Sequence, residues 1–214
     1  GNFLESLKII KKRIPLPMSV GRVCPRFCEK DCRKNIFGAA VSINDFKRLA
    51  ADLHYDTYME ELPALNGKKV TVVGAGPAGF AAAYDLRLAG VAVTMFDKQP
   101  EAGGMLRYGI PEFRLPNHIV DVEIENLKKM GVEFHADCIV GKTITIAQLE
   151  KEGYKGIFVG SGAGLPNFMG IKGENAINIM SSNEYLTRVN LMDAANPNTD
   201  TPLNIGKHVI VVGG

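Results

Sequence analysis

Hydrophobic positions follow two different patterns along the chain, and the change between them falls near residue 60. Before that point apolar residues recur every three or four positions, which is typical of amphipathic helices. We expect one helix over residues 2–13, ended by Pro15 and Pro17, and a second helix that begins at the cap residue Ser42. The apolar stripe of this second helix consists of Ile43, Phe46, Leu49 and Leu53.

Beyond a polar connector at residues 55–67, short apolar strands alternate with helices that end near glycines. This alternation predicts an α/β fold with a parallel sheet. The expected strands are residues 69–73, 91–96, 132–135, 138–140, 156–159 and 208–212. The expected helices are residues 80–88, 117–131, 145–153 and one that begins after Ser181.

The composition supports a globular protein and excludes several classes. Of the 214 residues, 46% are hydrophobic and 22% are charged, which suffices for a packed core. A net charge of +2 argues against general nucleic-acid binding, and no apolar run approaches the roughly 20 residues of a membrane span. The N-terminal charges follow the apolar residues, unlike those of a signal peptide. We therefore expect a cytoplasmic protein with no nucleic-acid or membrane partner.

Positive charge is concentrated at the N-terminal end, where residues 1–35 hold nine Lys/Arg against three Asp/Glu. The run Lys8, Lys11, Lys12 and Arg13 is expected to be a solvated helix end, because cations there interact favourably with the helix dipole. The alternative is a docking surface for a partner subunit.

A glycine turn joins the first expected strand of the α/β region to its first helix. Its residues are Gly74, Ala75, Gly76, Pro77, Ala78 and Gly79, with the spacing G-x-G-x-x-G. In dinucleotide-binding folds the first glycine permits a tight turn, the second admits a pyrophosphate, and the third lets helix and strand pack closely. Asp97 follows the next strand, where a carboxylate can bind ribose hydroxyls. The pattern predicts a dinucleotide site and leaves FAD and NAD open, while the charge of Asp97 disfavours a 2′-phosphate.

Two further stretches favour FAD over NAD. Residues 101–116 contain paired glycines together with Arg107 and Arg114, which can supply positive charge near a diphosphate or an anionic reduced flavin. Residues 158–166 end a buried strand in small residues that can pass close to a ligand at the carboxyl edge of the sheet. Taken alone, each stretch has a structural loop as its alternative interpretation.

Three of the four cysteines, Cys24, Cys28 and Cys32, lie within nine residues. Thiolates bind iron–sulfur clusters, and the basic residues around this cysteine segment suit an anionic cluster. The spacing alone leaves open zinc, with His54 as a fourth ligand, and simple reduced thiols. Cys138 stands apart and is expected to be a small buried hydrophobic residue.

Together these motifs resemble those of one family, the small (β) subunit of NADPH-dependent glutamate synthase and its relatives. The relatives include the large subunit of NADH-dependent ferredoxin:NADP oxidoreductase and the N-terminal half of dihydropyrimidine dehydrogenase. The resemblance covers nearly the whole chain, and its most specific stretches are GRVCP at residues 21–25 and GGMLRYGIP at residues 103–111. It implies a Rossmann-like FAD-binding domain with a glutathione-reductase-like parallel sheet, preceded by part of a small all-α Fe–S domain.

The resemblance also implies which residues bind cofactors. The FAD-binding positions would be Gly74, Ala75, Gly76, Pro77, Ala78, Gly79, Asp97, Lys98, Gly104, Met105, Leu106, Arg107, Gly109, Arg114, Val140, Ser161, Gly162 and Ala163. Cys24 and Cys28 would bind one [4Fe–4S] cluster and Cys32 a second, with the remaining ligands supplied by cysteines that this sequence lacks.

The implied domains are the end of a helical Fe–S domain at residues 1–60, the first half of an FAD domain at 61–206, and the first strand of an NAD(P)H domain at 207–214. We therefore expect a fragment, inactive alone and without a catalytic side chain, of an electron-input flavoprotein. Its parent would pass electrons between NAD(P)H, FAD and [4Fe–4S] clusters to a large glutamate synthase-type or other electron-accepting subunit. The rival interpretations are a single-Rossmann NAD-dependent dehydrogenase and a zinc-stabilised adaptor with a degenerate nucleotide fold.

Overall fold

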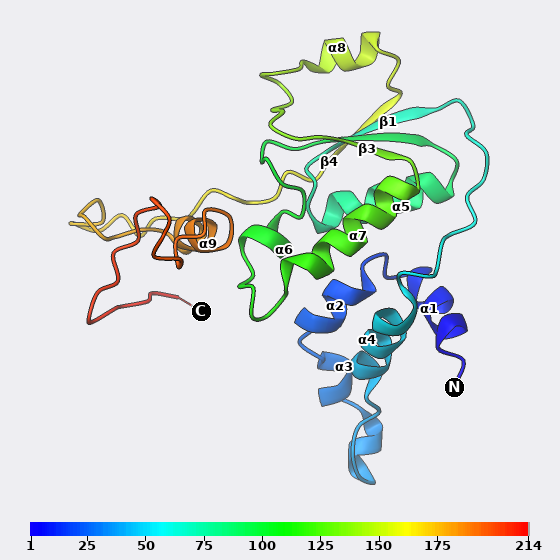
Figure 1. Ribbon diagram of the computed structural model, residues 1–214, viewed down its shortest axis with the longest axis horizontal. Helices are drawn as coiled ribbons and strands as arrows, with labels where there is room; N and C mark the ends of the chain where they lie inside the picture. The colour runs from blue at the N-terminus through cyan, green and yellow to red at the C-terminus, as the bar shows by residue number, and fades with distance from the viewer. Residues whose placement is uncertain (214) are drawn as a thin grey trace.

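A computed structural model describes residues 1–213, and Gly214, the last residue of the segment 207–214 expected to begin an NAD(P)H domain, lies outside the described residues. A small helical segment precedes an α/β domain (Figure 1). The helical segment comprises α1 (Phe3–Lys11), α2 (Pro17–Val23), α3 (Phe27–Lys30), the 3-10 turn η1 (Arg33–Ile36) and α4 (Ile43–His54). Both α1 and α2 pack against α4, and α2 also contacts the α/β domain.

Four strands form one parallel sheet in the order β3–β2–β1–β4. They are β1 (Lys69–Val73), β2 (Ala92–Phe96), β3 (Val132–His135) and β4 (Gly156–Val159). The helices of this domain are α5 (Pro77–Leu88), α6 (Met105–Tyr108), α7 (Asn117–Lys129), α8 (Ile146–Lys151) and α9 (Ser182–Asn190). Because α5 and α7 cover one side of the sheet and α8 lies on the other (Figure 1), the expected α/β, Rossmann-like class is confirmed.

The core lies between the sheet and its two long helices. Phe80 on α5 and Val120 and Leu127 on α7 are at most 2% exposed, and β2 is buried along nearly its whole length. A central parallel strand is expected to be apolar on both faces, and complete burial of each large side chain contributes about 1.5–3 kcal/mol. The helix α7 therefore holds the sheet on one side while its other side meets the helical segment.

The first turns of the helical segment differ from the sequence expectation. The first helix ends at Lys11, and Pro17 begins α2 at its first position, where the missing N–H of proline leaves no hydrogen bond unmade. The expectation of a solvated Lys11 is wrong, because its side chain is 1% exposed and forms an ion pair with Glu60. The ammonium also lies 4.2 Å from the ring centroid of Tyr55.

The helix α4 forms as expected, but its cap and its buried side come from tertiary contacts. Ser42 occupies the N-cap position without a capping hydrogen bond, and the backbone N–H of Asn44 instead donates to Glu29 Oε1 at 2.7 Å. The buried side is formed by Asn44, Lys47, Ala50 and Ala51. The apolar stripe faces solvent, with exposures from 42% at Leu49 to 59% at Phe46.

Two expected strands do not form. Residues 138–140 make only an isolated bridge, between Val140 and Ile144. Residues 208–212 form no strand within the described part of the chain, and Val209 to Val212 are largely exposed. A parallel strand requires a neighbour to pair with, and residues 160–213 instead leave the sheet as an arm that includes α9 (Figure 1).

Among residues 1–213, no helix is both long enough and apolar enough to cross a bilayer.

Candidate dinucleotide site and cysteine segment

Three loops meet at the carboxyl edge of the sheet. Pairing aligns the last residues of β1, β2 and β4, so that Gly74, Asp97 and Gly160 follow directly at one edge. The Gly74 N–H donates to the Phe96 carbonyl and the Gly160 N–H donates to the Val73 carbonyl, each at 2.8 Å. Ligands of open parallel sheets bind outside this edge.

Two of the three glycines in the first turn are required by packing within the protein. Gly74 has φ +106°, and a Cβ there would overlap the carbonyl of Gly160. A Cβ on Gly79, in the first turn of α5, would overlap the carbonyl of Gly74, which directly follows β1. Contacts inside the protein therefore explain both glycines, and no bound ligand is needed to explain them.

Gly76 is different, because no protein atom excludes a side chain there. Its φ of −99° suits any residue, and the nearest atom to a Cβ methyl group at this position would be Gly104 Cα at 3.7 Å. The open space lies at the N-cap of α5, whose first turn has no side-chain cap. Backbone N–H groups and the helix dipole make this a suitable place for a diphosphate.

Asp97 already organises this turn. One carboxylate oxygen, Oδ2, accepts from the Ala75 N–H at 2.5 Å, and Oδ1 accepts from the Gln99 N–H at 2.8 Å. Each oxygen has a further lone pair, and the residue is partly exposed. The carboxylate can therefore hold the glycine turn and bind ribose hydroxyls at the same time.

A second glycine pair packs against the first turn. The Gly103 N–H donates to the Ala75 carbonyl at 2.8 Å, and a Cβ on Gly104 would come within 2.7 Å of Gly76 Cα. Gly103 and Gly104 both have positive φ, and Gly104 is the N-cap of α6. The GGMLRYGIP stretch therefore contains a short helix, α6, that begins beside Gly76.

The two arginines of that stretch lie in different surroundings. Arg107 is 9% exposed, donates to the Ala102 carbonyl at 2.8 Å and forms an ion pair with Asp121. The positive charge of Arg107 is therefore already paired with Asp121, and its side chain stabilises the backbone next to Gly103. This internal role is an alternative to the expected contact with a diphosphate. Arg114 is exposed.

A cavity of about 330 Å³ opens beside Asp97. Its lining includes Ala75, Asp97, Glu101, Arg107, Phe134 and His135. The backbone around it is held by Tyr108, whose hydroxyl accepts from the Glu101 N–H at 2.9 Å, and burial raises the pKa of Tyr108 to about 12. A mixed apolar and polar cavity at this edge suits the adenosine part of a dinucleotide.

The remaining expected positions lie around this edge at different distances. Ser161 is next to Gly74, since a Cβ on Gly74 would lie 3.1 Å from Ser161 Cα. Val140 packs with Phe96 and Leu149 beyond the end of β2, and Cys138 joins the same cluster. The expected positions that are exposed to solvent are Pro77, Ala78, Lys98, Met105, Ser161, Gly162 and Ala163. Leu106 is buried and Gly109 is partly buried.

The cysteine segment lies on three separate short elements. Cys24 is the C-cap of α2, Cys28 lies exposed in α3, and Cys32 is the N-cap of η1. Backbone N–H groups of Val41 and Lys34 lower the pKa of the Cys32 thiol, which favours the thiolate that binds metals.

No metal site is complete in this segment. Over residues 1–213, no three His, Cys, Asp or Glu side chains are placed to hold one metal ion. The three thiols are suitable ligands, but they do not by themselves form a complete cluster site.

Sequence reasoning missed the residues that fix the site through distant contacts. Asp121, the partner of Arg107, lies 14 residues away on α7. Asn190 on α9 donates to the Tyr108 carbonyl at 3.1 Å and the Ile110 carbonyl at 3.3 Å. No local pattern marks either residue, because each acts on a segment that only the fold brings near.

A parallel sheet with a glycine turn and an acid at its carboxyl edge defines a nucleotide-binding α/β protein. Residues 68–214 match the sequence profile of the pyridine nucleotide-disulphide oxidoreductases, and the chain belongs to this family. Residues 1–59 match the profile described as dihydropyrimidine dehydrogenase domain II, 4Fe-4S cluster. The two profiles imply FAD or NAD(P) binding and a 4Fe-4S domain.

Curated relatives support the same assignment. The chain is 37% identical to the NADPH-Fe(3+) oxidoreductase subunit beta of Geobacter sulfurreducens, over 99% of this chain and 31% of that protein. It is 35% identical to the NADP(+)-dependent formate dehydrogenase subunit beta of Moorella thermoacetica, over 100% of this chain and 33% of that protein. It is 34% identical to the glutamate synthase [NADPH] small chain of Bacillus subtilis, over 100% of this chain and 44% of that protein.

The resemblance expected from the motifs is therefore confirmed. The chain spans only about a third of the length of the first two relatives. Among solved structures, FprA of Mycobacterium tuberculosis in complex with NADPH superposes with a TM-score of 0.51 at 21% identity, over 56% of this chain and 28% of that chain. This likeness extends to the fold alone.

Proposed function

We propose that residues 61–206 form the first half of an FAD-binding domain and that the turn at 74–79 receives the FAD diphosphate. Asp97 would bind the adenosine ribose, and the paired glycines at 103–104 would allow the ligand close to the backbone. Bound flavin would supply the redox chemistry, accepting hydride from a nicotinamide and releasing electrons singly. The protein's residues then contribute binding, orientation and electrostatics.

The observation that supports this proposal best is the open space at Gly76. Gly74 and Gly79 are explained by packing inside the protein, whereas Gly76 faces a region with no protein atom closer than 3.7 Å to its Cβ position. Gly76 is the N-cap of α5, so the region lies at the helix end where the first N–H groups have no partner within the helix. A glycine that the fold does not need is explained by the close approach of a ligand.

A pair of glycine variants tests the proposal. Gly76→Ala should leave the fold intact but weaken FAD binding by about tenfold or more, because the methyl group occupies the place of the diphosphate. Gly156→Ala is the matched control, since its Cβ position is also 3.7 Å from the nearest atom but lies at the amino end of β4. Flavin release on heating and the visible absorption of the purified chain give the readout. Equal FAD binding by the two variants would overturn the assignment of the site.

For the parent protein we propose an electron-input role, in which electrons pass between NAD(P)H, FAD and [4Fe–4S] clusters to a partner subunit. The role rests on three relatives, which are named as a subunit of an oxidoreductase, a subunit of a dehydrogenase and the small chain of a glutamate synthase. A large glutamate synthase-type subunit is the partner we favour. Residues 207–214 would begin the NAD(P)H domain, and residues 1–60 would end the Fe–S domain.

For the 214-residue chain alone we propose incomplete clusters and no NAD(P)H oxidation. Cys24 and Cys28 would serve one cluster and Cys32 another, and neither set completes a four-thiolate site. Acid-labile sulfide and iron should fall well below two full clusters per chain. Amounts equal to two clusters, or measurable NAD(P)H turnover, would contradict these assignments, and stoichiometric zinc would favour the adaptor interpretation.

A further inference from the structure

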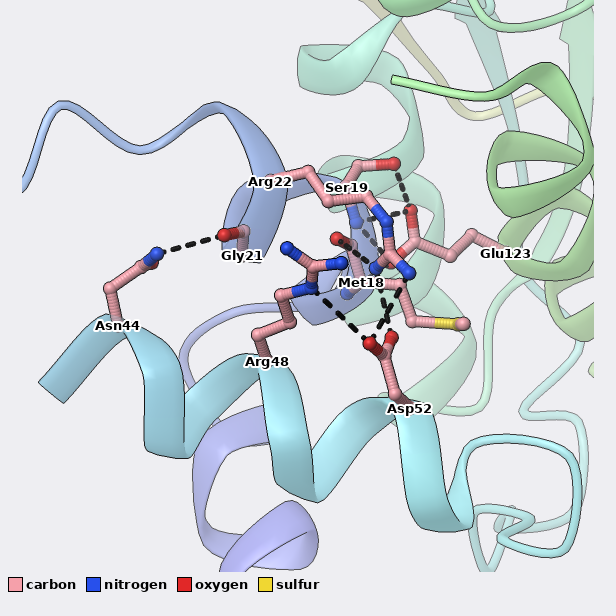
Figure 2. Close-up of polar contacts among 8 residues, drawn as sticks. All are labelled: Met18, Ser19, Gly21, Arg22, Asn44, Arg48, Asp52 and Glu123. Atoms are coloured by element: carbon pink, nitrogen blue, oxygen red, sulfur yellow. Dashed lines mark hydrogen bonds and ion pairs between the residues drawn. The ribbon is translucent and has the colours of Figure 1, made fainter. Parts of the chain in front are cut away.

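The helix α2 has no N-terminal cap of its own. Its N-cap residue is Leu16, which offers no side-chain acceptor, and Pro17 follows at the first position. The cap comes instead from Glu123 on α7 (Figure 2). Oε1 of Glu123 accepts from the Met18 N–H at 2.8 Å and from the Ser19 N–H at 3.2 Å, while the Ser19 hydroxyl donates to Oε2.

This contact is buried between the two parts of the molecule. Glu123 is 1% exposed and Ser19 is fully buried. The titratable groups that face it are the ammonium of Lys11 on α1 and the hydroxyl of Tyr55, the C-cap residue of α4. Burial raises the pKa of Glu123 to about 7, against the hydrogen bonds from Ser19 and Met18, which lower it. Burying a carboxyl group costs free energy, and the hydrogen bonds that both of its oxygens accept from Met18 and Ser19 offset this cost.

The other end of the same helix leads into the cysteine segment. Cys24 is the C-cap of α2, five residues after Ser19 and therefore about 7.5 Å along the helix axis. The helix is also fixed laterally, because a Cβ on Gly21 would lie 2.8 Å from Arg48 Cβ of α4 and the Asn44 amide donates to the Gly21 carbonyl at 2.8 Å. Figure 2 shows Glu123 and α4 contacting α2 from different sides.

Two kinds of contact thus act on α2, and they come from different parts of the chain. The α4 contacts, including the Arg22–Asp52 ion pair at 2.8 Å, belong to the helical segment. The hydrogen bonds from Met18 and Ser19 to Glu123, in contrast, join α2 to helix α7 of the α/β domain. Since α7 also provides Asp121 for Arg107, one helix contacts both the glycine turn at 103–104 and the helix that ends at Cys24.

We propose that Glu123 is a positioning residue that fixes the cysteine-bearing helix α2 on the nucleotide-binding domain and so sets where Cys24 lies relative to the glycine turns. The inference deepens the proposed function, in which these two places hold redox groups, but the contact itself requires neither group. Electron transfer between such groups depends on a constant separation, which this cap would maintain.

The test uses the chain without added nucleotide and compares three variants with the wild type. Glu123→Ala removes the cap, and Glu123→Gln keeps an acceptor oxygen of the same shape. Glu125→Gln is the control, because Glu125 is exposed on the same helix and forms an ion pair with its helix neighbour Lys128. Peptide-resolved alkylation reports the reactivity of Cys24 relative to the exposed Cys28. Hydrogen exchange reports the backbone of α2 and of β1–β3.

Glu123→Ala should raise the Cys24 to Cys28 alkylation ratio and the α2 exchange rate by about fivefold, the effect of losing a typical helix cap. Glu123→Gln should return both readouts close to wild type, Glu125→Gln should leave them unchanged, and β1–β3 should exchange at wild-type rates throughout. If Glu123→Ala does not fold, Ser19→Ala, which removes the hydroxyl bond alone, should shift the same two readouts in the same direction.

Unchanged Cys24 reactivity and α2 exchange in a folded capless variant would overturn the proposal. An equal increase in the hydrogen-exchange rates of α2 and of the sheet would also overturn it, because Glu123 would then stabilise the whole fold and not the position of α2. These outcomes are independent of FAD binding. A chain that binds no FAD but shows the predicted alkylation pattern refutes the proposed function and leaves this inference standing.

Discussion

Gly76 and Gly79 lie three residues apart in one turn, yet different constraints act on them. Gly79 is required because a side chain there would overlap the Gly74 carbonyl, whereas Gly76 faces open space at the start of α5. The G-x-G-x-x-G spacing predicts close helix–strand packing at Gly79 and close approach of a ligand at Gly76. This prediction is possible from sequence because the turn, the following helix and the acid are near one another in the chain. The pairing of Arg107 with Asp121 was not predictable in the same way, since no pattern links a loop arginine to one acid of a later helix.

We expect Gly79→Ala to lower the free energy of unfolding by about 2–3 kcal/mol, because the new methyl group overlaps the Gly74 carbonyl. Urea denaturation followed by circular dichroism measures the change. Gly156→Ala, with ordinary space around its Cβ, should stay close to wild type. Identical midpoints for the two variants would show that the turn at 74–79 is looser than described.

Glu123 predicts a pH dependence of stability. Its pKa is raised from 4.5 to about 7 in the folded protein, so between these values the folded state holds more protons than the unfolded state. The contribution of this group is therefore fully present below about pH 4.5 and is lost as the pH rises through about 7. Glu123→Gln, neutral throughout, should gain stability over wild type across this window, by up to about 1.4 kcal/mol per unit of pKa difference. Parallel urea-stability profiles for the two proteins between about pH 5 and about pH 8 would contradict this reasoning.

At the scale of elements, the local sequence predicts where α4 forms but not which of its sides is buried. The spacing of Ile43, Phe46, Leu49 and Leu53 gave α4 its place in the chain. The side that packs is the one with Ala50 and Ala51, because small residues allow α1 and α2 to approach. A strand at 208–212 failed for the complementary reason, since its apolar pattern is strand-like but the described residues offer it no partner.

The orientation of α4 makes an unusual prediction for hydrophobic substitutions. Leu49→Gln, on the exposed stripe, should change stability by less than about 0.5 kcal/mol. Ala50→Leu, a more hydrophobic change at a fully buried position, should destabilise by about 1–3 kcal/mol through overpacking. Thermal unfolding of the two variants measures both effects. A larger loss for Leu49→Gln would mean that the stripe is packed against protein in solution.

At the scale of the whole molecule, buried polar contacts join the helical segment to the α/β domain. Lys11 on α1 pairs with Glu60 of the connector and donates to Asn126 on α7 at 3.1 Å, and Glu60 accepts from the Tyr84 hydroxyl on α5 at 3.0 Å. The basic run containing Lys11 looked solvated in sequence, because its partners lie on three separate elements. Only the closure of the fold brings them together.

Loss of Lys11 should therefore be costly. Lys11→Ala leaves the Glu60 carboxylate buried without its cation and should destabilise the chain by about 3–5 kcal/mol. The double variant Lys11→Met/Glu60→Gln removes both charges and should recover a large part of that loss. Lys12→Ala, at the exposed neighbouring position, should have little effect in the same urea titrations. Additive losses in the double variant would contradict the pairing.

We propose that the turn at 74–79, with Asp97 and the glycines at 103–104, receives FAD. Equilibrium dialysis of the 214-residue chain against FAD, with NADH as competitor, measures this binding. We predict that FAD binds at one molecule per chain, that NADH competes poorly, and that Gly76→Ala weakens FAD binding by about tenfold while Gly156→Ala does not. Binding of NADH in place of FAD, or FAD binding unaffected by Gly76→Ala, would contradict the assignment of this turn to FAD.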